Sequence, residues 1–222
     1  LRNRYCRDCS LCLRACTYGA IEPVGKEWSV DDVMEEVMRD KAYYLHSNGG
    51  MTLSGGEALM QPEFSLALLK AACDNGIHTA IETSGFGRKK DLLSLLPYTG
   101  LFLWDVKMLD ETLHRRHTGV SFSRILDNLK NLSMSGANIV LRILFIPELH
   151  NNEKYLQTLA GLLDSLKNVS EIEVIPYHCM GMSKLEKLGL KTTDGSYREP
   201  SRGEIQDFEH RIFSLFYQHH IL

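Results

Sequence analysis

Apolar and polar positions follow two alternating patterns along the chain. Short runs that are almost wholly apolar occupy residues 51–54, 77–83, 100–106, 138–146 and 171–177, as expected of buried strands. Between them, residues 62–75, 89–96, 122–135 and 153–167 carry apolar side chains at helical spacing. Gly76 and Gly136 follow two of these stretches, at positions where helices commonly end. The pattern predicts a parallel sheet whose strands are connected by helices.

Two further helices are expected outside this repeat. Ser29 is placed to cap a helix that runs to about residue 45, with Asp31 and Asp32 in its first turn. Residues 201–222 form an amphipathic stretch whose apolar stripe includes Phe208 and Ile212. The 222 residues therefore fit a single α/β fold, a parallel barrel or partial barrel of the TIM type, without a second large domain.

Polar residues follow the predicted strands at their carboxyl ends, where parallel sheets bind ligands. The first strand leads into Ser54, Gly55, Gly56 and Glu57, the second into Glu82, Thr83, Ser84 and Gly85, the third into Asp105 and Lys107, and the fifth into His178, while the fourth contains Arg142. Two adjacent glycines let the backbone approach a ligand closely, and the following carboxylate is suited to an ammonium group. Each residue alone also has a structural interpretation, such as a tight turn or an ion pair of Arg142. Their convergence on one rim predicts an active-site face.

The composition restricts the partners of the chain. Charged residues make up 24% of it, the net charge is −3 and the pI is about 6.3. The chain therefore lacks the excess of basic residues that is typical of proteins that bind nucleic acid. No apolar run is long enough to span a membrane, and the first residues lack the pattern of a signal peptide. We therefore expect a cytoplasmic protein that binds neither nucleic acid nor membranes.

Four of the six cysteines, Cys6, Cys9, Cys12 and Cys16, lie in one short segment with the spacing C-x2-C-x2-C-x3-C. This clustering indicates a reducing compartment and a metal site rather than a disulfide framework. The spacing is that of bacterial ferredoxins, in which three close thiolates hold one 4Fe-4S cluster and the fourth reaches a second. The alternative is a zinc or mononuclear site that uses all four thiolates, as a structural metal clip. We expect residues 1–27 to form a loop held by iron and sulfur, and residues 28–222 to form the barrel.

In order and spacing, these motifs resemble those of the glycyl-radical-enzyme activating enzymes, the radical S-adenosylmethionine (SAM) relatives of pyruvate formate-lyase activase. The likeness comprises MTLSGGEA from Met51, ETSGF from Glu82, DVK from Asp105, and PYH from Pro176 with Gly181 and Lys184 after it. It covers almost the whole chain. Residues 1–27 resemble the second half of the ferredoxin-like insert that one subgroup of this family carries.

The resemblance implies a role for each matching residue. Gly55, Gly56 and Glu57 match the Gly-Gly-Glu that receives the SAM ammonium group, and Ser84, Arg142 and His178 match residues that contact SAM. Glu82, Thr83, Asp105 and Lys107 match the group beside the SAM carboxylate. In the best-studied members the counterparts of Asp105 and of the acidic-Thr pair help to hold a monovalent cation there, and oxygen ligands suit such a hard cation.

The activity implied by the resemblance is that of an oxidoreductase. In this family a reduced 4Fe-4S cluster cleaves SAM, and the resulting 5'-deoxyadenosyl radical takes a hydrogen atom from a glycine of a partner glycyl radical enzyme. The expected cofactors are therefore 4Fe-4S clusters, SAM and a monovalent cation. The expected partners are the glycyl radical enzyme and an electron donor of the flavodoxin or ferredoxin type, and we expect the chain to be a monomer.

The chain departs from the family pattern in one respect. The C-x3-C-x2-C motif of the catalytic cluster is absent from its sequence, and the five predicted strands match the family's second to sixth. We therefore expect a partial (β/α)6 barrel that lacks its first strand, an N-terminally truncated chain that does not cleave SAM by itself. The alternative is an iron-sulfur electron-transfer or SAM-binding module without radical chemistry. A C-x3-C-x2-C motif upstream of Leu1 would distinguish the two.

Overall fold

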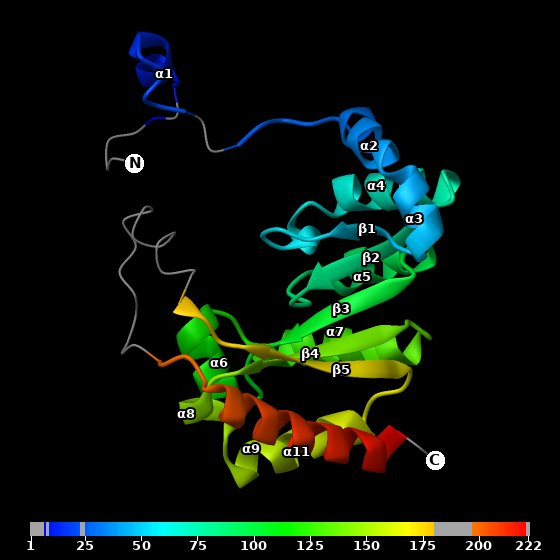
Figure 1. The fold of residues 1–222 in the computed structure, drawn as a ribbon, viewed down its shortest axis with the longest axis vertical. Helices are drawn as coiled ribbons and strands as arrows, with labels where there is room; N and C mark the ends of the chain where they lie inside the picture. The colour runs from blue at the N-terminus through cyan, green and yellow to red at the C-terminus, as the bar shows by residue number, and fades with distance from the viewer. Residues whose placement is uncertain (1–6, 8, 23–24, 180–196, 221–222) are drawn as a thin grey trace.

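The computed structural model contains a single sheet of five parallel strands in the order β1-β2-β3-β4-β5 (Figure 1). The structure describes residues 7, 9–22, 25–179 and 197–220, so Cys6, Gly181 and Lys184 lie outside the described part. The strands are β1 (Gly50–Leu53), β2 (His78–Thr83), β3 (Leu101–Val106), β4 (Ile139–Phe145) and β5 (Val169–Pro176). All five strands predicted from the apolar runs are confirmed.

Helices connect the strands where the apolar periodicity predicts them. They are α4 (Pro62–Asp74), α5 (Lys89–Leu95) with the short η2 (Leu96–Tyr98), α7 (Phe122–Met134) and α9 (Glu153–Asp164). The predicted C-terminal helix is α11 (Arg202–His220), which follows β5. In Figure 1, α9 and α11 lie side by side below β5. Within the described residues, no helix is both long and apolar enough to cross a membrane.

Three helical features differ from the predictions. The helix expected from Ser29 to residue 45 begins with the predicted cap but is split at Asp40 into α2 (Val30–Arg39) and α3 (Lys41–Ser47), because Asp40 leaves helical backbone angles (φ −97°, ψ 7°). The cysteine segment was expected to be a loop, yet α1 (Leu11–Ala15) forms a short helix within it. The apolar pattern did not reveal α6 (Glu111–Thr118), α8 (Pro147–His150) or η1 (Ala58–Met60), which are short or mostly polar.

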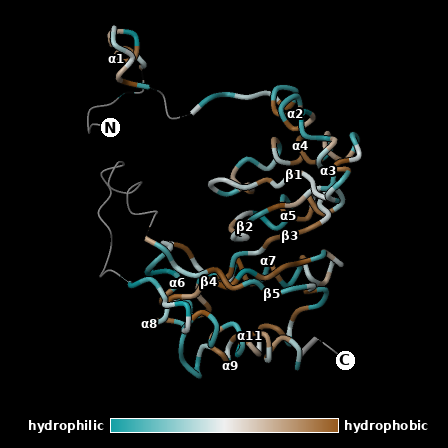
Figure 2. The backbone as a smooth tube through the Cα atoms, viewed as in Figure 1, coloured by the Kyte–Doolittle hydropathy of each residue, from teal (hydrophilic) through white to brown (hydrophobic). Residues whose placement is uncertain are grey.

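The two faces of the sheet have different surroundings because side chains alternate along each strand. On the face toward the helices, Phe102, Trp104 and Phe145 are fully buried, and Phe208 of α11 stacks on Phe145 with ring centroids 4.1 Å apart. Figure 2 shows the hydrophobic residues concentrated along β4 and its neighbours. We call the opposite face the inner face; among its residues are Glu82, Leu103, Asp105, Arg142, Leu144 and Glu173, which are half-buried or exposed.

A β-bulge in β5 decides which of its side chains reach the inner face. Ile139 pairs with Val169, but the next residue of β4 pairs with Glu171. The extra residue shifts the alternation by one position, so that Glu171 and Glu173 share the inner face with Arg142. The shift also explains why the sequence indicated a strand only from residue 171, two residues after β5 begins.

Gly85 and Gly76 form a matched pair for testing how tightly the sheet is packed. Both have positive φ, +77° and +71°. A Cβ on Gly85 would lie 2.0 Å from Cζ2 of the buried Trp104 ring, whereas nothing lies within 4 Å of a Cβ on Gly76. We expect Gly76→Ala to cost about 1 kcal/mol of unfolding free energy, and Gly85→Ala to cost about 3 kcal/mol or more. Equal stabilities in urea unfolding would contradict the packing of Trp104 beneath Gly85.

Candidate functional site

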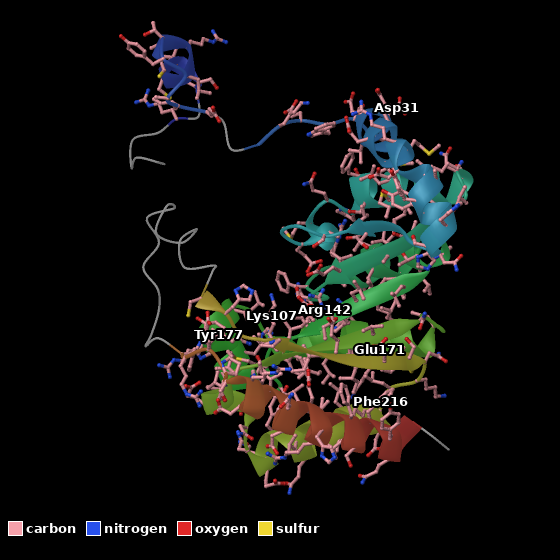
Figure 3. All side chains as sticks on the ribbon, viewed as in Figure 1. Asp31, Lys107, Arg142, Glu171, Tyr177 and Phe216 are labelled. Atoms are coloured by element: carbon pink, nitrogen blue, oxygen red, sulfur yellow. The ribbon has the colours of Figure 1, made fainter. Side chains whose placement is uncertain are left out.

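The structure gathers the predicted site residues on the inner face and on the rim where the strands end. Figure 3 shows Lys107 and Tyr177 toward the side of the sheet on which the strands end, Glu171 toward the opposite side, and Arg142 between them, in the middle of β4. Glu57, in the turn after β1, is hydrogen-bonded to the end of β2. The side chains of Lys107 and His178 are exposed at the ends of β3 and β5.

Four donors hold the Glu57 carboxylate. Its Oε1 accepts hydrogen bonds from Oγ1 of Thr83 at 2.6 Å and from the amide of Leu59 at 3.2 Å. Its Oε2 accepts from the amide and the hydroxyl of Ser84, at 2.9 and 2.6 Å. A carboxylate has about four acceptor positions, so the protein itself uses all of them. Glu57 therefore fastens the Gly-Gly-Glu turn to the end of β2. It has no free position to accept a hydrogen bond from a ligand, so it would act on a nearby ligand through its negative charge.

The two glycines before Glu57 leave the turn open. Gly55 has φ +118°, a conformation that L side chains rarely adopt, and no atom lies within 4 Å of a Cβ built on Gly55 or Gly56. Both residues are exposed. The backbone of this turn is thus accessible to a ligand.

Arg142 lies among three carboxylates on the inner face. Its Nη1 is 2.9 Å from Oε1 of Glu82, and its Nε is 3.5 Å from both Oδ1 of Asp105 and Oε2 of Glu173. Ser54 donates a hydrogen bond to the other oxygen of Glu82 at 2.9 Å. The ion pair that the sequence allowed as a structural interpretation of Arg142 is therefore present. Glu173 was not predicted because it lies within β5 rather than at the carboxyl end of the strand, and its position opposite Arg142 depends on the register of the two strands.

The inner face has an excess of negative charge. Burial raises the pKa of Asp105, although Arg142 and Lys107 act to lower it. Among the described residues, Oδ1 of Asp105 and Nε of Arg142 are buried atoms without a hydrogen-bond partner, so their 3.5 Å separation is an ion contact only. A buried carboxylate oxygen left without a partner is costly. A ligand or ion of positive charge would satisfy it.

Three of the four predicted cluster ligands lie in the described part of the chain. Cys9 and Cys12 are exposed and Cys16 is half-buried, while Cys6 is outside that part. Within it, no group of three or more His, Cys, Asp or Glu side chains is arranged to hold a metal ion. Sγ of Cys16 accepts a hydrogen bond from the amide of Ala20 at 3.2 Å, and backbone hydrogen bonds of this kind lower the pKa of its thiol. Amide hydrogen bonds to sulfur suit a cluster-binding thiolate.

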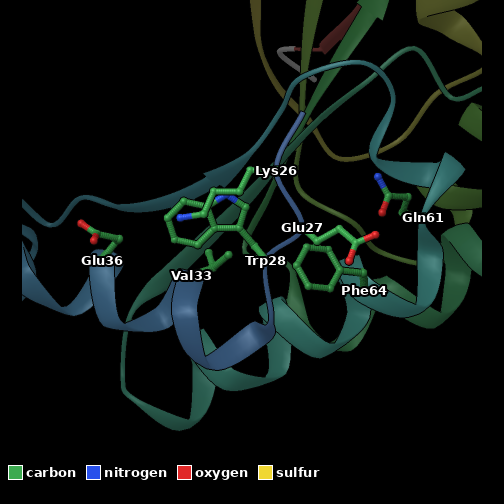
Figure 4. Close-up of a pocket in the computed structure, with 7 residues that line it drawn as sticks. All are labelled: Lys26, Glu27, Trp28, Val33, Glu36, Gln61 and Phe64. Atoms are coloured by element: carbon green, nitrogen blue, oxygen red, sulfur yellow. The ribbon is translucent and has the colours of Figure 1, made fainter. Parts of the chain in front are cut away.

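A cavity of about 750 Å³ lies elsewhere, beside the segment that leads into α2 (Figure 4). Its lining includes Trp28, Val33, Gln61 and Phe64, and Nζ of Lys26 is 3.9 Å from the centre of the Trp28 ring. It contains none of the residues predicted from the strand ends. Since the converging charged and hydroxyl groups lie on the inner face and at its rim, we place the candidate site there rather than in this cavity.

The chain is similar in sequence and in fold to proteins of one superfamily. A model of the radical SAM superfamily matches residues 7–160. The isethionate sulfite-lyase activating enzyme of Nitratidesulfovibrio vulgaris is 38% identical over 193 residues, which are 86% of this chain and 62% of that enzyme. The pyruvate formate-lyase-activating enzyme of Clostridium pasteurianum is 35% identical over 182 residues, 82% of this chain and 75% of that enzyme. A solved domain of a pyruvate-formate lyase-activating enzyme from Bacteroides vulgatus superposes with a TM-score of 0.62 at 28% identity, over 75% of this chain and 94% of that domain.

The chain belongs to the radical SAM superfamily and, within it, to the family of glycyl-radical-enzyme activating enzymes. The resemblance inferred from the motifs is confirmed, as is the α/β partial-barrel fold. Membership of the superfamily implies a 4Fe-4S cluster and SAM as cofactors. The chain spans less than two thirds of the Nitratidesulfovibrio vulgaris enzyme, 62% of its length.

Proposed function

We propose that this chain is the SAM-binding part of an enzyme that generates a glycyl radical on a partner enzyme. The observation that carries the proposal is the Gly-Gly-Glu turn fastened to the end of β2 at the rim of a radical SAM fold, with Glu57 holding the two together. SAM carries a sulfonium and an ammonium group, and the acidic inner face complements both charges. The names of the relatives, activating enzymes of several lyases, support the same activity.

Particular residues are suited to the different groups of SAM. The open backbone of Gly55 and Gly56 would receive the amino acid part beside the charge of Glu57. The cations of Arg142 and Lys107 would face its carboxylate, and the remaining site residues, Ser84 and His178, would contact the rest of the molecule. SAM and the reduced 4Fe-4S cluster supply the radical chemistry when bound, whereas the chain orients SAM and excludes water.

A monovalent cation beside SAM is supported by the oxygen of Asp105 that has no hydrogen-bond partner. Its Oδ1 is buried without a hydrogen-bond partner, and the acidic side chain of Glu82 and the end of β2 at Thr83 lie on the same rim. Carboxylate, hydroxyl and carbonyl oxygens are the ligands that hard cations take. We assign Glu82, Thr83 and Asp105 to this ion, with Lys107 at the SAM carboxylate.

The cysteine segment is proposed to hold an auxiliary cluster. Cys6, Cys9, Cys12 and Cys16 would be its ligands in residues 1–27, beside a barrel unit of residues 28–222. Clustered thiols that must stay reduced support a cytoplasmic location. The proposed partners are a glycyl radical enzyme as protein substrate and a flavodoxin or ferredoxin-type electron donor, with the activating enzyme a monomer.

Anaerobic turnover tests the proposed activity. Protein expressed from the complete coding sequence and reconstituted with iron and sulfide is mixed with SAM and a reductant. We expect 5'-deoxyadenosine and methionine in equal amounts, and a carbon-centred radical in the electron paramagnetic resonance spectrum of the partner enzyme. Intact clusters without SAM cleavage would contradict the proposal and favour an electron-transfer or SAM-binding module.

A further inference from the structure

Asn128, a buried polar side chain on α7, is hydrogen-bonded to the loop that follows β2 at the candidate site. Asn128 is 3% exposed, and its Nδ2 donates hydrogen bonds to the carbonyl oxygens of Gly85 at 2.9 Å and Gly87 at 3.1 Å. These carbonyls belong to the loop after β2, far from Asn128 in the sequence. Both donor hydrogens of the amide are thus used to hold that loop.

The hydroxyl groups of Thr83 and Ser84 connect this loop to the Gly-Gly-Glu turn. The amide of Gly85 donates to Oγ1 of Thr83 at 2.9 Å, and the same hydroxyl donates its single hydrogen to Glu57 at 2.6 Å. Ser84, between them, adds its amide and hydroxyl as two further donors to Glu57. A displacement of Gly85 would therefore misdirect three of the four donors that hold the Glu57 carboxylate.

The loop has little freedom to adopt another course. Gly85 lies directly on the Trp104 ring, which is fully buried, and its φ of +77° is one that L side chains rarely adopt. Trp104 supports the loop from the core, and Asn128 holds its two carbonyls from the side. In a packed interior such satisfied polar networks favour one conformation.

We propose that Asn128 is a positioning residue of this site. By holding Gly85 and Gly87, it keeps Thr83 and Ser84 directed at Glu57, and so keeps the Gly-Gly-Glu turn in its binding geometry. The identity of the ligand as SAM rests on the proposed function, but the link from Asn128 to Glu57 does not. Residues that lock the groups in contact with a ligand set its affinity without touching it.

Ser133 on the same helix provides a matched control. It is 1% exposed, and its Oγ donates a hydrogen bond to the carbonyl of Lys167 at 2.6 Å. That contact fixes the segment before β5, at the opposite end of the sheet from the site. The same hydroxyl accepts a hydrogen bond from the amide of Lys167 at 2.5 Å. Ser133→Ala therefore removes two hydrogen bonds from α7, as many as the Asn128 amide makes, without disturbing residues 54–61 or 83–87.

The test compares Asn128→Ala, Asn128→Asp and Ser133→Ala in protein from the complete coding sequence. Asn128→Ala loses both donors and leaves a cavity, whereas Asn128→Asp keeps the shape of the side chain but replaces the donors by a carboxylate that repels the two carbonyl oxygens. A change shared by both variants is therefore due to the lost hydrogen bonds rather than to the cavity or the charge. We expect all three variants to melt at lower temperature. Only the Asn128 variants should show faster hydrogen-deuterium exchange at residues 54–61 and 83–87, together with SAM binding weakened about tenfold. If neither Asn128 variant folds, Asn128→Ser, which leaves a polar group in the cavity but is too short to hold both carbonyls, should show the same changes.

Different results would contradict the positioning role of Asn128 and the proposed SAM-dependent function. Unchanged exchange at residues 54–61 in a folded Asn128 variant, or an equal change in Ser133→Ala, would overturn the positioning role. A wild-type protein that binds no SAM would overturn the proposed function instead. The exchange measurement would still decide whether Asn128 holds the turn that contains Glu57.

Discussion

Glu57→Gln is expected to reduce the rate of SAM cleavage about a hundredfold while leaving the iron content unchanged. The substitution replaces one carboxylate oxygen by an amide NH2 group, which only donates and must face either Thr83 and the amide of Leu59 or the amide and hydroxyl of Ser84. Because a backbone amide cannot become an acceptor, at least one donor loses its partner. Hydrogen bonds to a charged group contribute about 1.5–3 kcal/mol each. The loss of one, together with the loss of the charge that strengthens the others, corresponds to about two powers of ten in rate.

Glu63→Gln is the matched control for this experiment. Glu63 is an exposed carboxylate in the first turn of α4, six positions after Glu57, so the two variants make the same change of charge. The rate of 5'-deoxyadenosine formation is measured for both, with iron and sulfide assayed in parallel. Turnover at the wild-type rate in Glu57→Gln would contradict the role assigned to the turn, and an equal loss in Glu63→Gln would show that net charge alone is responsible.

Asp105→Asn is expected to have opposite effects on stability and on function. Burial raises the pKa of Asp105, so its ionised form is disfavoured in the folded protein, and asparagine removes that penalty. Arg142 keeps its 2.9 Å contact with Glu82 and its neighbour Glu173. We therefore expect a higher melting temperature together with a loss of SAM cleavage of at least about tenfold, since the oxygen assigned to the cation is replaced or neutralised.

The pH dependence of this stabilisation has a definite sign. A carboxyl group whose pKa is higher in the folded than in the unfolded chain binds more protons when folded, so its contribution to stability falls as the pH rises. The advantage of Asp105→Asn is therefore absent below the ordinary pKa of 3.8 and increases as the pH rises through the raised pKa of Asp105. Melting curves at pH 4 and pH 7 measure it. A stabilisation that shrinks toward pH 7 would contradict the assignment of a raised pKa.

The strands could be predicted because most of their residues are apolar and one face of the sheet is buried against the helices, and the site because parallel strands bring their ends to one rim. What the sequence does not contain is the partner of each polar group. Glu57 was expected to face an ammonium group, yet its acceptor positions are taken by Thr83, Ser84 and Leu59. An asparagine within an amphipathic helix, such as Asn128, has no distinguishing pattern, since only the tertiary fold brings it to the loop after β2.

Backbone irregularities were the other limit of prediction. The bulge in β5 brings Glu173 to Arg142, and nothing in the alternation of residues 169–176 marks which residue is the extra one. The break between α2 and α3 at Asp40 involves neither proline nor glycine, so the apolar stripe appeared continuous. In α1 a few residues form a turn of helix without any amphipathic period. These features depend on packing and local backbone angles, which a hydrophobic pattern does not specify.

The two tryptophans of this chain occupy opposite surroundings. Trp104 is fully buried beneath Gly85, whereas Trp28 is 42% exposed beside Lys26. Indole emission moves to longer wavelength when water reaches the ring, and soluble quenchers act only on exposed rings. With Trp28 replaced by phenylalanine, the emission of Trp104 becomes a label-free optical signal for the loop after β2, because any departure of Gly85 from the ring opens it to solvent.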